Sequence, residues 1–550
     1  MDWGQPEWDH RHALLERPIS RRQMLKSAAA LGAASVFGPV VSARAQGPGK
    51  PSGKVTAAMY VDITSLDPGA TVYIPGILIL KSLVETLVEL DDKGNPRPRL
   101  ATNWKASPDG KVWTFRLREG VRFHDGTPFD AEAVKFTFDR ILDPATKSQT
   151  GASLIGPYKA SEVVDPQTIK MTFSDPYAPI FANFSNPVLG IVSPSAVKKY
   201  GADFGEHPIG TGPYMFKEWV HGDHVTLTRY DKYVNTSTLV HHKGLPYLDT
   251  VVVRFILDHQ TRLAALLAGE IDFMFNVPAL DSVNLRHDPR ARVVQTMFTG
   301  CPTVQHVNRQ LPPTNDLAVA KAIQFAVNRD VIAKIGTQSV SPVAWGPLKS
   351  SNWGYNPQVK TLYRFDPEKA KQLLTEAGWV PGPNGIRVKN GQEAKLVSAT
   401  KDDKLVISEL EAMQGMLRAV GLDLEIKVMA LAASEELARQ GKNSLSRTNW
   451  WGTDPDILTT FYHSKSIGGW NFGYFKNDEV DRLLDTGRAT LEPKKRLEIY
   501  NRVQMLIMEQ AAVLPLYDWV AINAARTGLQ GIRFDATKYY PEWYDVTWKS

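Results

Sequence analysis

The chain of 550 residues contains a single cysteine, Cys301. One cysteine excludes an intrachain disulfide and any metal site built from several cysteines, and we expect Cys301 to be a small buried apolar residue. The sequence also lacks G-x-S-x-G, H-E-x-x-H, Walker and complete G-x-G-x-x-G motifs, which carry much of known hydrolytic and nucleotide chemistry. His241 and His242 are its only adjacent histidines, and their spacing supplies no third metal ligand. We therefore expect no catalytic residue, no metal and no cofactor.

Charge and hydropathy exclude two further classes of protein. The chain has 64 Lys and Arg against 58 Asp and Glu, and no basic block is long enough to act as a nucleic-acid footprint. Beyond residue 45, no stretch is apolar enough to span a bilayer. We expect a mature protein that binds no nucleic acid and is not embedded in a membrane.

The first 45 residues have the pattern of an export signal. Ser20-Arg21-Arg22-Gln23-Met24-Leu25-Lys26 precedes an uncharged run, and Ala43-Arg44-Ala45 supplies an A-x-A cleavage pattern. The twin arginines indicate the twin-arginine route; the segment resembles S-R-R-x-F-L-K, with Met24 where Phe is usual. No cysteine follows the cut, so a lipid anchor is not expected. We predict a twin-arginine signal peptide over 1–45 and a periplasmic protein of a Gram-negative bacterium.

The remaining residues alternate between strand and helix patterns. Trp113, Phe115 and Leu117 alternate with polar residues, as in a half-buried strand. Asp130 can cap a helix with Val134, Phe138, Ile141 and Leu142 on one face. Apolar residues at helical spacing over 77–88 predict another helix in 77–90. Two further helices, 366–378 and 405–421, have clear stop signals, and alternating residues 422–428 follow the second. This succession indicates an α/β unit.

Several segments carry a family resemblance. Residues 109–129, DGKVWTFRLREGVRFHDGTPF, follow Asn103-Trp104 and resemble the signature of the bacterial extracellular solute-binding proteins of family 5. These are the oligopeptide- and dipeptide-binding proteins of ABC importers. HPIGTGPY at 207–214 and AGEID at 268–272 are similar to later family segments. The chain departs from the family at Ala133 and Asn328, where Asp is usual.

The resemblance implies a fold and a division of the chain. The expected fold is α/β: a two-lobed periplasmic-binding-protein fold, class II-like and of cluster C, with an extra subdomain and a ligand cleft between the lobes. Domain I would comprise residues 54–84, 208–297 and 516–550. Domain II would be residues 85–207, and domain III residues 298–515. Crossings near Met297–Phe298 and Pro515–Leu516 would form the hinge.

The stretch from Asn449 to Asp456 combines groups suited to binding. Trp450 and Trp451 supply rigid apolar surface, although only one of them easily faces a given cavity on an extended strand. Gly452 allows close approach to the backbone, and Asp454 would need a cationic partner if buried. The alternative is a surface turn with both aspartates solvated and one Trp in the core.

The resemblance assigns roles in this stretch. Trp451, Gly452 and Asp454 match the family's W-x-A-D loop, with Thr453 in place of Ala, and that loop places an Asp where it receives the ammonium of a peptide. The resemblance therefore implies Asp454 as the ligand anchor and Trp451 as a packing surface. Trp450, Trp470 and Phe472 are further candidate contacts, and Thr64 and Tyr73 would line the opposite wall.

The predicted function is that of a periplasmic substrate-binding component of an ABC importer. The protein would act as a monomer that captures a short peptide or similar amine-bearing solute and delivers it to the inner-membrane permease. An opine, a glycoside or a metal chelate is the alternative ligand. A periplasmic hydrolase using Asp454 or Asp456, and a ligand carrier for a chemoreceptor, are the rival functions.

Overall fold

The computed structural model describes residues 53–71 and 74–549. Tyr73 and the predicted export signal lie outside the described residues.

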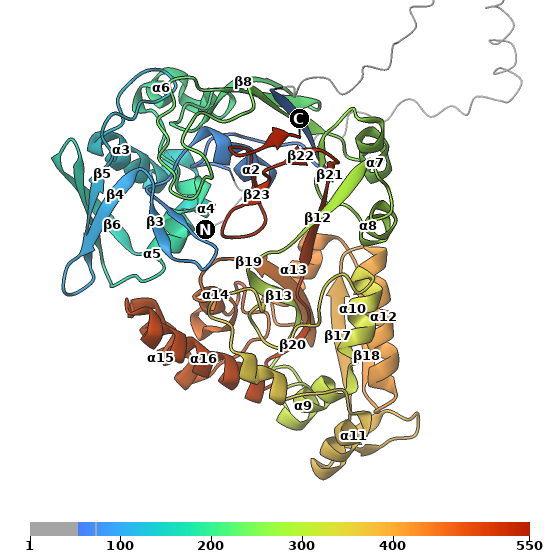
Figure 1. Cartoon of the computed structure of the whole chain (residues 1–550). Coiled ribbons are helices and arrows are strands. Elements are labelled where there is room, and N and C mark those ends of the chain that lie inside the picture. The colour runs from blue at the N-terminus through green and yellow to red at the C-terminus, as the bar shows by residue number, and fades with distance from the viewer. Residues whose placement is uncertain (1–52, 72–73, 550) are drawn as a thin grey trace, which may run out of the picture. The chain divides into compact units, whose positions relative to one another are not determined.

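A seven-stranded mixed sheet forms the centre of the first lobe, in the upper part of Figure 1. Its strands, in sheet order, are β12 (Ala291–Met297), β21 (Val520–Arg526), β11 (Phe273–Met274), β1 (Lys54–Met59), β10 (Thr250–Phe255), β9 (His224–Arg229) and β8 (Tyr214–Val220). Val55 and Ala57 of β1 belong to the core that contains α2 (Ile74–Leu83). Ala58, on the opposite face, packs with α7 (His259–Ala268) and α8 (Ala279–Leu285). Helices thus cover both faces, which explains why β1 is almost wholly apolar.

A smaller antiparallel sheet lies beside it, in the order β4 (Ala101–Ala106), β5 (Val112–Leu117), β7 (Thr168–Phe173), β6 (Tyr158–Asp165). Helix α3 (Ala131–Leu142) packs against β6 and β7 in the same core. Asp130 caps α3 by accepting a hydrogen bond from the Ala133 N–H, so the predicted strand and capped helix are confirmed. Leu142, the last residue of the predicted face, is 43% exposed, because the helix ends there at Asp143.

The helix expected over 77–90 is shorter than predicted. Helix α2 ends at Leu83, and Glu85 forms a bridge with Ile191. Residues Val88–Leu90 then form strand β2, which pairs with β3 (Pro96–Pro98). The apolar spacing of Leu87 and Val88 therefore comes from their burial in the core of the smaller sheet, where tertiary packing overrides the helical pattern.

The second lobe is built around a three-stranded sheet in the order β19 (Leu445–Trp451), β13 (Gly300–Val307), β20 (Val513–Tyr517). One core on this sheet includes residues of α9 (Leu317–Ala326), α10 (Arg329–Thr337), α11 (Pro367–Glu376) and α12 (Lys404–Arg418). A second core includes residues of α14 (Ile457–Tyr462), α15 (Asp478–Ala489) and α16 (Pro493–Glu509). The central strand β13 is buried throughout, and its Cys301 is a free, buried thiol as predicted.

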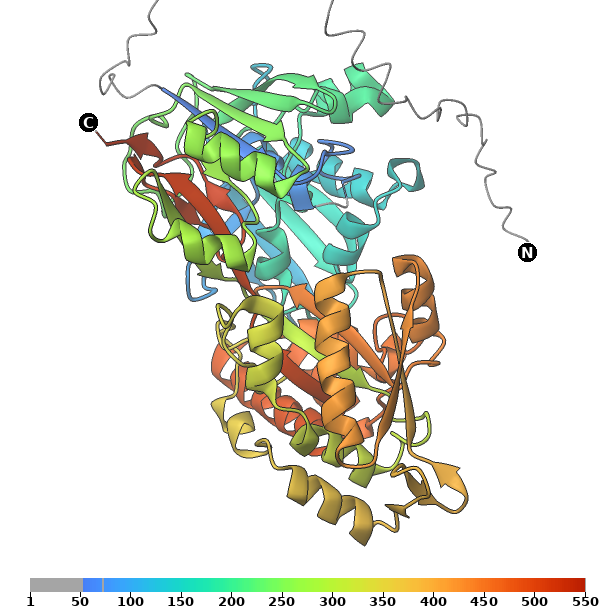
Figure 2. The same cartoon turned by 90° about the vertical axis from the view of Figure 1, so that its right-hand side faces the viewer.

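The predicted α/β unit of the second lobe is also confirmed. Strand β17 (Lys395–Thr400) runs parallel to β18 (Asp423–Val428), and α12 connects them. Figure 2 shows this pair beside α12 in the lower lobe. Helices α11 and α12 begin after Asp366 and Asp403, whose side chains accept hydrogen bonds from the first turn. Gly378 and Gly421, the predicted stop signals, take left-handed backbone conformations shortly after these helices end. Glycine is common at this position because it adopts that conformation without strain.

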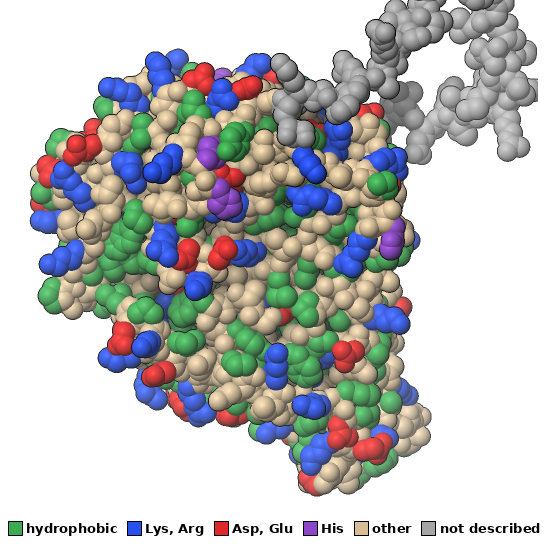
Figure 3. All heavy atoms as spheres, in the orientation of Figure 1, with side chains coloured by type: hydrophobic (Ala, Val, Ile, Leu, Met, Phe, Trp, Pro, Cys, Tyr) green, Lys and Arg blue, Asp and Glu red, His purple; other side chains and the backbone are tan. Residues whose placement is uncertain are grey.

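In the part of the chain that the structure describes, no helix has both the length and the apolar character needed to cross a bilayer. Figure 3 shows basic and acidic side chains interspersed on one face of the molecule, without a large patch of one sign.

Candidate functional site

Two segments of the chain pass between the lobes. Strand β12 ends at Met297 and β13 begins at Gly300, while β20 ends at Tyr517 and β21 begins at Val520. Figure 1 shows β12 and β21 leaving the upper sheet toward the lower lobe. The second crossing lies slightly after the predicted Pro515–Leu516, because Pro515 still pairs with Val304 inside the lower sheet.

Residues 349–351 connect the two crossings. The Lys349 N–H donates to the Gly300 carbonyl at 2.8 Å, and the Ser350 hydroxyl donates to Asp518 Oδ2 at 2.6 Å. One short loop thus contacts the chain at both crossings.

A cavity of about 200 Å³ lies at these crossings. Its wall comprises Phe275, Asn276, Phe298, Asn449, Trp451, Trp519, Ala521, Ile522, Asn523 and Tyr539. The first lobe contributes residues following β11, residues of β21 and Tyr539. The second lobe contributes Asn449 and Trp451 of β19, and the crossings contribute Phe298 and Trp519. A cavity with walls from both lobes and a floor at the crossings is the natural place for a ligand that stabilises closure.

Among the predicted site residues that the structure describes, Trp451 alone lines this cavity. The ring of Trp450 stacks against it, with centroids 5.0 Å apart and planes 3° apart. Trp450 in turn contacts Trp470 at 4.9 Å, so a row of aromatic rings supports the cavity wall. The expectation that only one of the two indoles faces a cavity agrees with this arrangement.

Gly300 allows Trp451 to occupy this position. The two residues are paired across β13 and β19, and Gly300 has φ +119°, a conformation that other residues rarely adopt. A Cβ atom at Gly300 would lie 2.4 Å from the Trp450 carbonyl oxygen. The close approach of the two backbones therefore depends on glycine.

Asp454, the predicted ligand anchor, is paired within the second lobe. Its two oxygens accept hydrogen bonds from Arg496 at 2.7 Å and 2.6 Å, and the side chains are only 13% and 6% exposed. Burial alone would lower the pKa of Arg496, but its charge and hydrogen-bond interactions with Asp454 raise it above the ordinary arginine value. Both carboxylate oxygens are thus already engaged by a cation of the protein, which argues against the predicted anchoring role.

Asp456 is likewise neither solvated nor free. It accepts hydrogen bonds from the Arg488 side chain, the shortest at 2.9 Å, and from the Tyr500 hydroxyl at 3.1 Å. Burial raises the pKa of the Asp456 carboxyl, although the charge of Arg488 opposes that rise. The surface-turn alternative for these two aspartates is therefore contradicted: both are largely buried.

The other predicted contacts lie outside the cavity wall. Gly452 donates its N–H to the Thr299 carbonyl at 3.2 Å and accepts a hydrogen bond from Asn352. Phe472 is buried beside His306, in the interior of the second lobe. Thr64 is exposed and is not among the cavity residues. Tyr73 is outside the described residues.

The sequence carries no local sign of most residues of this wall, apart from Asn449, which belongs to the tryptophan stretch. The others come from separate segments, and no short motif connects Phe275 with Trp519 or Tyr539. One local signal is visible in the structure: Asn276 has φ 56°, an unusual conformation that asparagine tolerates better than most residues.

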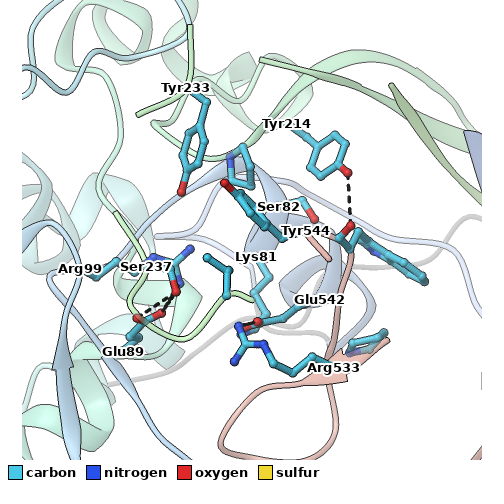
Figure 4. A pocket seen from close by; sticks show the side chains of 14 residues that line it. Lys81, Ser82, Glu89, Arg99, Tyr214, Tyr233, Ser237, Arg533, Glu542 and Tyr544 are labelled. Atoms are coloured by element: carbon cyan, nitrogen blue, oxygen red, sulfur yellow. Dashed lines mark hydrogen bonds and ion pairs between the residues drawn. The ribbon is translucent and has the colours of Figure 1, made fainter. Parts of the chain in front are cut away.

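A second cavity, shown in Figure 4, lies among charged side chains of the first lobe and measures about 30 Å³. Lys81 contacts Glu542 at 2.8 Å and Asp535 at 3.2 Å, and Arg533 also pairs with Glu542. Burial lowers the pKa of Lys81 to about 8. The space holds only one or two waters, so it is too small for a solute.

The adjacent histidines have structural contacts as well. His242 interacts with Asp545 at 2.8 Å and with the Leu245 carbonyl at 2.9 Å. Among the described residues, no group of three His, Cys, Asp or Glu side chains is placed to hold a metal ion.

Comparison with known proteins agrees with this architecture. The glutathione-binding protein GsiB of Escherichia coli (strain K12) is 28% identical over 491 residues, which are 87% of this chain and 91% of GsiB. The structure resembles the periplasmic binding protein DppA of Helicobacter pylori in complex with the peptide STSA, with a TM-score of 0.74 and 26% identity over 91% of this chain and 99% of that one. It also resembles NikA of Brucella suis in complex with Fe(III)-EDTA, with a TM-score of 0.80 and 26% identity over 90% of this chain and all of NikA. These neighbours confirm the predicted two-lobed α/β fold.

Two family models also match the chain. The twin-arginine translocation signal model matches residues 18–38, which confirms the predicted export signal. The model of the middle region of the bacterial extracellular solute-binding proteins, family 5, matches residues 95–472. Because that match covers more than half of the sequence, the chain belongs to the bacterial extracellular solute-binding proteins of family 5.

Proposed function

We propose that this protein captures a small solute in the cavity at the lobe crossings and delivers it, as a monomer, to an inner-membrane ABC permease. Its family and its twin-arginine signal make it a periplasmic solute-binding protein of the ABC importer type. The choice of this cavity as the binding site is carried by one observation: both lobes and both crossing segments contribute to its wall.

Contacts at the outer edge of the lobes support a closing mechanism. The Ala178 N–H, following β7 in the first lobe, donates to the Arg488 carbonyl of α15 at 2.8 Å. The Arg488 side chain is held by Asp456. A ligand that contacts both walls favours the form in which this edge contact is made, because it interacts less with separated lobes.

We assign the predicted site residues different roles within this mechanism. Trp451 contacts the ligand, and Trp450 and Trp470 hold its ring in place. Asp454 is proposed to be structural, since its charge is neutralised by Arg496. A short peptide or another amine-bearing solute stays a prediction from the sequence, although no carboxylate of the described residues lines the cavity to receive an ammonium group.

We also propose that the protein has no enzymatic activity. The relatives named above are binding proteins, and the two carboxylates that a hydrolase would use are each engaged by an arginine. Native mass spectrometry of the protein purified from its own periplasm tests both proposals. A solute retained in one-to-one stoichiometry and released unchanged is the expected result.

Solution scattering then tests closure. Returning the released solute to the ligand-free protein should reduce the radius of gyration and raise the melting temperature through mass action. Trp451→Ala should weaken this response, and Thr64→Ala serves as the control outside the cavity wall. Conversion of the solute into a product, or tight binding without any change in scattering, would contradict the proposal.

A further inference from the structure

The wall of the cavity at the lobe crossings has a composition that favours some classes of ligand over others. Among the described residues that line it, none is Asp, Glu, Lys, Arg or His. Its one ionisable group is Tyr539, whose pKa burial raises well above the ordinary value, so the phenol is neutral. An ionic group entering this space finds no counter-charge among the residues that line the wall; the buried Lys349 Nζ lies 3.1 Å from the Phe298 ring centroid but does not line the cavity. An unpaired charge is costly to remove from water.

The wall combines flat apolar surfaces with fixed orientations. Trp451 is backed by the parallel ring of Trp450. Phe298 packs edge-to-face against Tyr539, with centroids 5.6 Å apart and planes at 80°. Trp519 adds a third large ring at the second crossing. The faces of aromatic rings carry negative quadrupole potential, which attracts the C–H groups of a ring-shaped ligand.

Three asparagines supply polar groups between the rings. The side chains of Asn276 and Asn449 make no hydrogen bond to the described residues. Asn523 is 4% exposed; its Oδ1 accepts the Asn276 N–H at 3.3 Å. The Nδ2 atom of Asn523 has no partner in the part of the chain described, and a buried donor of this kind calls for an acceptor. Each amide both donates and accepts, and this matches a hydroxyl group, which does the same.

The size of the cavity limits the ligand further. An engineered protein cavity of about 150 Å³ accepts benzene, so about 200 Å³ accommodates one six-membered ring with substituents. A peptide of several residues would extend beyond this volume.

We propose that the ligand presents a neutral, polyhydroxylated ring to this cavity, namely the pyranose ring of a sugar. This inference rests on the proposed function, because it names the class of solute that the same cavity captures. The C–H faces of the ring would lie against Trp451 and the other aromatic rings, and its hydroxyl groups would bond to the three asparagine amides.

Three sugars of the same ring size but different charge test the proposal. We expect calorimetry to show binding of glucose, as the free sugar or within a glucoside, and at least tenfold weaker binding of glucosamine and glucuronate. Glutathione and a dipeptide are the zwitterionic comparisons. Because no ion pair is involved, the affinity for glucose should change little between low and high salt.

A single substitution should reverse this charge preference. Asn449→Asp introduces a carboxylate of nearly the same shape, so glucosamine should gain about tenfold or more relative to glucose through a charge-assisted bond. Asn384→Asp, on an exposed loop of the same lobe, makes the same charge change away from the cavity and should leave the ratio unaltered. Circular dichroism and melting curves of both variants establish that they fold.

The outcomes separate this inference from the function on which it rests. A retained periplasmic solute that proves to be a neutral sugar supports both. A retained peptide or other charged solute, or binding of glutathione without binding of any neutral sugar, overturns the sugar assignment and leaves solute capture standing. Absence of any retained solute, together with no binding of the sugars, glutathione or dipeptide, overturns both.

Discussion

Replacing Asp454 by Asn should destabilise the ligand-free protein. A loss of stability in the absence of ligand is expected of a structural residue but not of a ligand anchor. The substitution keeps the shape of the side chain but removes the charge that two short hydrogen bonds from Arg496 now balance. Both side chains are almost fully shielded from solvent, so Arg496 would remain as a buried cation that keeps its bond to the Gly487 carbonyl but loses the carboxylate that balances its charge. Breaking a buried pair on one side costs about 3–5 kcal/mol, against about 0–1 kcal/mol for a pair at the surface.

Urea unfolding of ligand-free protein, followed by tryptophan fluorescence, measures this loss. Arg496→Gln and the double variant complete a cycle that isolates the coupling between the two residues. Glu492→Gln is a matched control from the residue that precedes the same helix: its pair with Lys495 is largely exposed, and its loss should cost less than about 1 kcal/mol. If Asp454→Asn leaves the stability of the ligand-free protein unchanged but reduces affinity for a cationic ligand, the structural role is refuted and the anchor role restored.

Three further perturbations test other parts of the molecule. Gly300→Ala should lower the free energy of unfolding by at least about 1–3 kcal/mol through backbone strain, and it should displace Trp451; unchanged stability and ligand affinity would contradict the close-packing argument. Burial lowers the pKa of His306 to about 3, whereas in the unfolded chain this histidine has the ordinary pKa of about 6.5. As the pH falls, the unfolded chain therefore binds a proton at this residue before the folded protein does. Stability should therefore decrease by about 2 kcal/mol between about pH 7.5 and 5 because of this residue, and His306→Gln should flatten that dependence in denaturation curves. Changing Arg21 and Arg22 together to Lys should trap the precursor inside the cell, and normal periplasmic accumulation in a fractionation experiment would refute the export route.

Local signals in the sequence predicted much of the fold. Asp130 and Asp366 begin their helices because a short carboxylate side chain satisfies free N–H groups of the first turn. Gly378 and Gly421 follow helix ends where a positive φ is needed. These features depend on neighbours within a few residues, so they are readable without the tertiary structure. The helix predicted over 77–90 shows the limit of such reasoning, since pairing of β2 with β3 decides the conformation of Val88–Leu90.

The site could be predicted only in part, for a related reason. The tryptophan stretch was recognisable from its own composition, and Trp451 does line the cavity. The sequence does not reveal the partner of Asp454, because Arg496 lies 42 residues further along the chain and many other arginines are candidates. The same holds for the cavity wall, which several distant segments build together. Charge balance in a buried site is a property of the folded arrangement, and a carboxylate in a loop does not reveal whether its counter-ion is a ligand or the protein itself.

The arrangement of the stretch around Trp451 has a consequence for closure. Trp451 faces the cavity, while Asp456 a few residues later holds Arg488, whose carbonyl accepts the Ala178 N–H from the other lobe. That edge contact is one backbone hydrogen bond, with a net value of about 0.5–1.5 kcal/mol, which favours the closed form by no more than about tenfold. Other residues of the two lobes also lie close together, since a Cβ atom at Gly94 would meet Trp353 at 2.9 Å and one at Gly110 would meet Leu491 at 3.3 Å. A solute adds contacts that exist only when both walls of the cavity touch it. Affinity is therefore expected to depend far more on the residues of the cavity wall than on the contact at the edge.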